Sequence, residues 1–269
     1  MRPVSDSFEP AQSYLSQCRT LIDLVEKQLP QIRLAADWFS QSILANRLVH
    51  LFGSGHSRIM VEEMWPRYGS FPGFHPIVEL SLTYHTQVVG ANGQRQAMFL
   101  ENVSGLAERI LRNFEIHQPD SALVISSSGC NVVPVEMAQI FQSKGLRVVG
   151  IYSKSHSEMS TSRHPSGLKL SDVCDLMIDT GAPVGDAMVH IEGLDTPVSP
   201  GSTVGGCLIV NAIKAEVASR LTAAGCPPLV LTAGALVGSE KAGRLFEGAY
   251  DEHARRVAQL YENSARDEL

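Results

Sequence analysis

The sequence predicts an α/β fold, a doubly wound parallel sheet flanked by helices. Short apolar runs rich in β-branched residues alternate with longer stretches of helical periodicity, and glycines stand where several helical stretches end. Parallel strands need such crossover helices, which then cover both faces of the sheet. We therefore expect a three-layer sandwich of the flavodoxin-like or Rossmann-like kind, preceded by N-terminal helices.

The elements follow one another in a regular order. Residues 13–48 have apolar side chains at helical spacing with a break at Pro30, which predicts two leading helices. RLVHLF predicts the first strand and ALVI the second, and LRVVGIY follows a helix that ends near Lys144 and Gly145. A fourth strand is expected in CDLMIDT, a short helix in NVSGLAERIL, and further helices over residues 203–221 and 236–261.

Composition excludes several classes of protein. At 269 residues and 44% hydrophobic, the chain can bury a full core. A formal charge of -6 without a basic block argues against a nucleic-acid partner. No apolar run reaches the ~18 residues that span a membrane, and the first residues lack a signal-peptide pattern, so we expect a cytoplasmic protein with no membrane partner. The five cysteines include no C-x-x-C pair and indicate neither a disulfide framework nor a zinc ribbon.

Two loops are predicted to bind a ligand, because ligands of such sheets lie beyond the carboxyl ends of the strands, where helix N-termini favour anions. The glycine turn consists of Gly53, Ser54, Gly55, His56 and Ser57. The serine loop consists of Ser126, Ser127, Ser128, Gly129, Cys130 and Asn131.

The composition of these loops favours a phosphate monoester over a nucleotide cofactor. Arg58 stands where a dinucleotide fingerprint needs its third glycine, and no Walker lysine follows either loop. One capping residue would suffice to start a helix, so three serines are a surplus that suits phosphate oxygens. Cys130 lies where a helix N-terminus can lower a thiol pKa.

These residues resemble the sugar isomerase (SIS) domain. ALVISSSGCNVVPVEMAQIFQSKGLRVVGIYSK resembles the second strand–loop–helix–strand unit of that domain. RLVHLFGSGHSRIMVEEMWPR resembles its first glycine–serine turn and the helix with paired glutamates found in phosphoheptose isomerases. The resemblance covers about residues 47–221, and TGAPVGDAMVHI and GSTVGG are similar to a poorly characterised phosphosugar isomerase subgroup.

The resemblance implies three segments and a set of partners. We expect N-terminal helices over 1–46, an SIS phosphosugar-binding domain over 47–224, and a C-terminal helical segment over 225–269 that packs on the same domain. A sugar phosphate is the implied ligand, and a homodimer or higher homo-oligomer the implied assembly. Ile59 stands where the zinc histidine of phosphoheptose isomerases lies, so we predict no metal and no cofactor.

The implied activity is aldose–ketose isomerisation through an enediol, which needs a base whose pKa partial burial raises. Glu63 is the predicted base, because it shares a helix face with Ile59. Glu62 follows Arg58 by four residues and also fits an ordinary ion pair. His56 is a further acid–base candidate.

For several other residues the sequence does not decide the role. Ser202 and Thr203 start a helix, where they can cap it or face the sugar. Glu101 is expected to cap the helix that follows it or to reach a neighbouring subunit. The roles of His75 and His85, in an irregular segment that can cover the site, and of Asp186 and His190 stay open, as does the sugar itself. The alternative functions are an amino-sugar-phosphate etherase or lyase, and a non-catalytic phosphosugar sensor acting through a partner protein.

Overall fold

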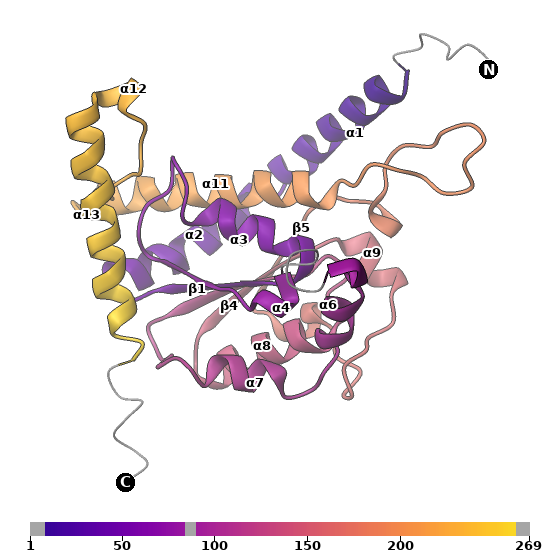
Figure 1. Ribbon diagram of the computed structural model, residues 1–269, viewed down its shortest axis with the longest axis horizontal. Coiled ribbons are helices and arrows are strands. Elements are labelled where there is room, and N and C mark those ends of the chain that lie inside the picture. Colours follow the sequence, from indigo (N-terminus) through magenta and orange to yellow (C-terminus); the bar gives the residue numbers. More distant parts are fainter. Residues whose placement is uncertain (1–8, 84–89, 262–269) are drawn as a thin grey trace.

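Five parallel strands form the centre of the computed structural model, which describes residues 9–83 and 90–261 (Figure 1). Their order across the sheet is β2-β1-β3-β4-β5. The strands are β1 (Val49–Gly53), β2 (Phe74–Ile77), β3 (Ser121–Ile125), β4 (Arg147–Tyr152) and β5 (Leu176–Asp179). Each neighbouring pair is parallel, and helices cover both faces, so the predicted fold class is confirmed.

One face of the sheet is covered by helices from both ends of the chain. These are α1 (Glu9–Glu26), α2 (Leu29–Leu44), α3 (Arg58–Met64), α11 (Ser202–Ala223) and α13 (Ser239–Ala258), with the short α12 (Gly234–Val237) before α13. Phe39 of α2 and Ile209 of α11 are buried in one cluster with Leu51 and Leu123 of the sheet. Pro30 lies in the first turn of α2, where its missing N–H breaks no helical hydrogen bond, and the two leading helices are confirmed.

The opposite face is covered mainly by α7 (Leu106–Leu111) and α8 (Val132–Ser143), as Figure 1 shows. Successive residues of a strand point to opposite faces, so Phe52 and Val124 point away from the first cluster. On the opposite face they pack in one cluster with Met137 and Phe141 of α8. Shorter helices connect the layers: α4 (Leu80–Thr83), α6 (Arg95–Leu100), α9 (Lys154–Met159) and α10 (Leu170–Val173). Among the described residues, no helix is both long and apolar enough to cross a membrane.

The segment that we expected to be irregular contains the edge strand β2. Pro76 lies within it, and an edge strand tolerates a proline because one side of it has no partner strand. His75 is therefore a buried strand residue with 6% exposure and does not belong to a loop that covers the ligand site. His85 lies outside the described residues.

A buried polar network joins the first strands at their amino-terminal ends. Asp120 accepts hydrogen bonds from Arg47 Nε at 2.8 Å and Nη2 at 2.7 Å, and its Oδ2 lies 3.2 Å from His50 Nε2. His50 Nδ1 in turn lies 2.9 Å from His75 Nδ1. All four side chains are buried, and Arg47 also donates to Gln259 beyond α13. The network thus fastens the C-terminal segment to the sheet.

This network predicts loss of stability in mild acid. Burial lowers the pKa of His75 from 6.5 to about 3. Burial alone would raise the pKa of Asp120, but hydrogen bonds from His50 and Arg47 outweigh it and hold that pKa below its usual range. At these two side chains the unfolded state therefore binds more protons than the folded state below about pH 6.5, and their contribution to the free energy of unfolding falls as pH falls from there toward 3.

Urea unfolding measured across this pH range tests the expectation. His75→Gln removes the titrating ring, so its free energy of unfolding should fall less steeply with acid than that of the wild type. Parallel profiles for the two proteins would show that His75 does not titrate as described.

Candidate active site

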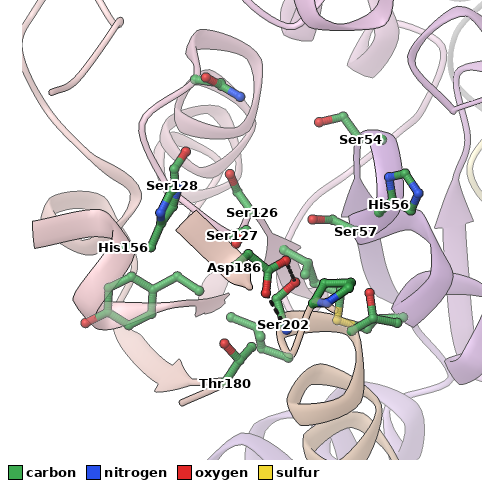
Figure 2. Close-up of a pocket in the computed structure, with 18 of the residues that line it drawn as sticks. Ser54, His56, Ser57, Ser126, Ser127, Ser128, His156, Thr180, Asp186 and Ser202 are labelled. Atoms are coloured by element: carbon green, nitrogen blue, oxygen red, sulfur yellow. Dashed lines mark hydrogen bonds between the residues drawn. The ribbon is translucent and has the colours of Figure 1, made fainter. Parts of the chain in front are cut away.

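A cavity of about 580 Å³ opens beyond the carboxyl ends of the strands, within the size range of small-molecule sites (Figure 2). The glycine turn and the serine loop face each other across it. The start of α11 and the turn before it form a third side. Of the predicted binding residues, the following line it: Ser54, Gly55, His56, Ser57, Ser126, Ser127, Ser128, Asn131, Ser202 and Thr203.

The two remaining predicted binding residues, Gly53 and Gly129, shape the loops and do not line the cavity. A Cβ on Gly53 would lie 2.7 Å from the carbonyl oxygen of Ser57, so only glycine permits this turn. Gly129 has a φ of +63°, in the left-handed region that favours glycine, and a Cβ there would lie 3.2 Å from Leu170 Cβ. Both glycines are thus required by the backbone path.

The serine loop presents hydroxyl groups with unused donor capacity. Ser126 Oγ accepts a hydrogen bond from the N–H of Gly129 at 3.2 Å, and Ser128 Oγ accepts one from the N–H of Cys130 at 3.3 Å. Each hydroxyl keeps its own proton to donate. Ser127 Oγ is buried and has no hydrogen-bond partner in the described part of the chain. With Asn131 at the N-cap of α8, these groups suit an anion with several acceptor oxygens.

Glu101 lies between these two loops, directly after α6. Its Oε2 accepts a hydrogen bond from Ser54 Oγ at 2.7 Å, and its Oε1 accepts one from Asn131 Nδ2 at 2.7 Å. Burial raises the pKa of Glu101 above its usual value, although the Ser54 hydrogen bond and the charge of Arg163 act in the other direction. A carboxylate with a raised pKa in a cavity is a candidate general base.

Glu101 does not cap the helix that follows it, contrary to one of its two expected roles. The helix that follows, α7, has Gly105 at its N-cap, and the N–H of Gly105 donates to the carboxylate of Glu136. The carbonyl of Glu101 instead accepts from the N–H of Val133 at 2.9 Å, in the first turn of α8. Glu101 is therefore fixed to the serine loop by its main chain and its side chain.

Glu62 and Glu63 do not line the cavity. Glu62 forms the predicted ion pair with Arg58 at 3.2 Å. Glu63 pairs with Arg67, and Asn211 Nδ2 donates to its Oε1 at 2.8 Å. Burial raises the pKa of Glu63, but hydrogen bonds from Asn211 and Arg67 outweigh it, so the net pKa is lowered. The prediction of Glu63 as the base disagrees with both its position and its charge environment.

The third side of the cavity is organised by Asp186, whose role the sequence left open. Asp186 Oδ1 accepts from the N–H group of Gly201 at 3.0 Å. It also accepts from the N–H group of Ser202 at 2.8 Å, and Oδ2 accepts from Ser202 Oγ at 2.5 Å; dashed lines in Figure 2 mark the bonds between Asp186 and Ser202. Asp186 therefore caps α11, and Ser202 and Thr203 lie in the first turn facing the cavity. His190 is exposed in the loop that follows.

Sequence reasoning missed His156, which lines the cavity from α9. The N–H of Gly185 donates to His156 Nδ1 at 3.0 Å, so the neutral ring has its proton on Nε2. Ser153 Oγ accepts from the N–H of His156 and fixes the start of the helix. His156 is thus held as an imidazole with one defined donor.

Cys130 is not an activated thiol. Burial raises its pKa, and its Sγ donates to the carbonyl of Ser128 at 3.2 Å. Its position at the start of α8 could lower this pKa, but loss of solvation outweighs the favourable charges nearby.

Residues 13–153 match the family model of the SIS domain, and the chain belongs to the SIS-domain family. Within it the chain belongs with the UPF0309 proteins. It is 32% identical over 234 residues to UPF0309 protein lin2794 of Listeria innocua, covering 87% of this chain and 92% of that protein. It is also 32% identical over 253 residues to UPF0309 protein GWCH70_1414 of Geobacillus sp., covering 94% and 96%.

A solved structure shares the fold. The phosphoheptose isomerase from Francisella tularensis aligns with a TM-score of 0.50 at 13% sequence identity, covering 78% of this chain and 97% of that chain. At this identity the likeness concerns the fold alone.

Proposed function

We propose that the protein binds a sugar phosphate in this cavity and interconverts its aldose and ketose forms. The observation that carries the proposal is that serine hydroxyls with unused protons and a carboxylate with a raised pKa line the same cavity. Membership of the SIS-domain family and a fold shared with a phosphoheptose isomerase support it.

The phosphate is assigned to the serine loop. Ser126, Ser127 and Ser128 donate to its oxygens, and the amino-terminal end of α8 contributes a favourable dipole. The sugar then extends toward Glu101 and the glycine turn, with Ser202 and Thr203 on the third side.

Glu101 is assigned as the base in place of Glu63. Its carboxylate takes the proton from C2 of the aldose, and the resulting carboxylic acid returns that proton to C1 of the enediol. Overall, a hydroxyl proton must also pass from O2 to O1. His56 and His156 both line the cavity and are the candidates for that transfer.

A thermal-shift screen tests the binding half of the proposal. Each sugar phosphate is compared with the same sugar lacking phosphate, because the serine loop should respond only to the former. A ligand at 100 times its dissociation constant stabilises the folded state by about 2.7 kcal/mol. If no sugar phosphate raises the melting temperature, the proposal fails.

We further propose that the protein is a symmetric homodimer. α1 carries exposed apolar side chains, with Leu15 at 52% and Ile22 at 49% exposure, and Figure 1 shows its first turns extending away from the sheet. Light scattering should give twice the chain mass. A species of 29.2 kDa at micromolar concentration with ligand present would contradict the dimer.

A further inference from the structure

The cavity lacks an obvious partner for the charge of a phosphate. Among the described residues that line it, none is Lys or Arg, and two, Glu101 and Asp186, are acidic. A phosphate monoester carries a charge of about -1.5 to -2 near neutral pH. The serine hydroxyls and the amino-terminal end of α8 would have to hold this charge beside two carboxylates. If the proposed function is right, a cation next to the cavity would strengthen phosphate binding.

Arg163 is a cation that lies against Asn131, a residue that lines the cavity. It lies in the loop between α9 and α10, and its N–H donates to the carbonyl of Cys130 at 2.8 Å. Its guanidinium Nη1 donates to Asn131 Oδ1 at 3.0 Å, so the charge lies against the N-cap of α8. The loop is fastened again at its end, where the N–H of Leu170 donates to the carbonyl of Gly129 at 2.8 Å.

The nearby Lys169 already uses its ammonium group in a hydrogen bond within the protein. Its Nζ donates to the carbonyl of Ser157 at 2.6 Å and anchors the loop. Arg163, by contrast, is exposed and uses one donor of its guanidinium on Asn131. A guanidinium has five N–H donors in a planar fork that matches two phosphate oxygens.

We propose that Arg163 binds the phosphate of the substrate from the outer edge of the serine loop and makes the site selective for doubly charged phosphate groups. The inference rests on the proposed function and adds a binding residue to it. The three serines hold the inner oxygens, and the guanidinium donates to the outer ones.

The same arrangement links the phosphate to the base. Asn131 accepts from Arg163 and donates to Glu101, and Ser54 donates to the other oxygen of Glu101. These four side chains form one hydrogen-bonded chain from the rim to the glycine turn. A phosphate that draws Arg163 toward itself therefore changes the partners of Asn131, the residue that holds Glu101.

The test is calorimetric titration of the full-length protein with inorganic phosphate at about pH 7.5, where the dianion predominates. Arg163→Gln should weaken phosphate binding by about 10- to 100-fold, the size of a lost hydrogen bond between charged groups. Arg163→Lys should lose less, because it keeps the charge but not the fork. Added salt should weaken binding to the wild type more steeply than binding to Arg163→Gln.

Two further variants separate the possible failures. Arg244→Gln is the matched control, since Arg244 pairs with Glu240 on the exposed side of α13, and it should bind as the wild type does. Ser127→Asp should abolish binding by blocking the serine loop. If Ser127→Asp abolishes binding while Arg163→Gln binds normally with an unchanged salt dependence, the proposed site stands and the role of Arg163 is refuted. If Ser127→Asp binds normally, the proposed phosphate site fails, and the role of Arg163 fails with it.

Discussion

Replacing Glu101 by Gln is expected to lower turnover of the best-binding sugar phosphate by about 10²–10⁴-fold, the usual contribution of a positioned general base. The amide has the shape of the carboxylate and can still accept a hydrogen bond from Ser54 or Asn131, so ligand affinity should stay within a few-fold. Steady-state kinetics together with calorimetric binding would separate the two effects.

Glu63→Gln is the matched control for this prediction. It makes the same chemical change on α3, outside the cavity, where the carboxylate is held by Arg67 and Asn211. We expect turnover close to that of the wild type. The reverse pattern, in which Glu63→Gln loses turnover and Glu101→Gln keeps it, would identify Glu63 as the general base.

Ser127→Asp is expected to abolish binding of every sugar phosphate. Ser127 Oγ is buried without a partner at the serine loop, so an aspartate there places a negative charge against the phosphate oxygens. Calorimetric titration measures the loss, and thermal unfolding of the unliganded variant checks that the fold is intact.

Ser143→Asp controls for the added charge, because Ser143 ends α8 while the serine loop precedes its start. A helix of 12 residues is about 18 Å long, well beyond the screening length of physiological salt. This variant should bind as the wild type does. Normal binding by correctly folded Ser127→Asp would remove the serine loop as the phosphate site.

The buried part of the fold could be predicted from the sequence because its strands are apolar on both faces. The interior strands β1, β3 and β4 stand in largely apolar runs, as interior strands of parallel sheets do, and the edge strand β5 also begins with three apolar residues. β2 was missed because Pro76 and the polar His75 interrupt its apolar residues. His75 is buried as part of a hydrogen-bond network with His50. Such a strand has no periodic pattern to read.

The candidate site could be predicted only in part, for a related reason. The two loops follow neighbouring strands, so their meeting at one edge of the sheet follows from the fold class. Glu101 directly follows α6, and His156 lies in α9. Both line the cavity because of the paths that these helices take, and no local sequence motif specifies those paths. For Glu63 a signal was present: Arg67 follows it by four residues, the same spacing that identified the pair of Arg58 and Glu62.

Solvent deuterium exchange at C2 of a tightly bound sugar phosphate tests the central claim most directly. When the proton that Glu101 has taken from C2 exchanges with solvent before it is returned, deuterium enters C2 even if net isomerisation is slow, and the label is read by nuclear magnetic resonance. We expect the wild type to incorporate deuterium and Glu101→Gln to do so about 10²–10⁴-fold more slowly. Absence of both deuterium exchange and aldose–ketose interconversion by the wild type with any tightly bound sugar phosphate would contradict the isomerase account and favour the etherase or sensor alternative.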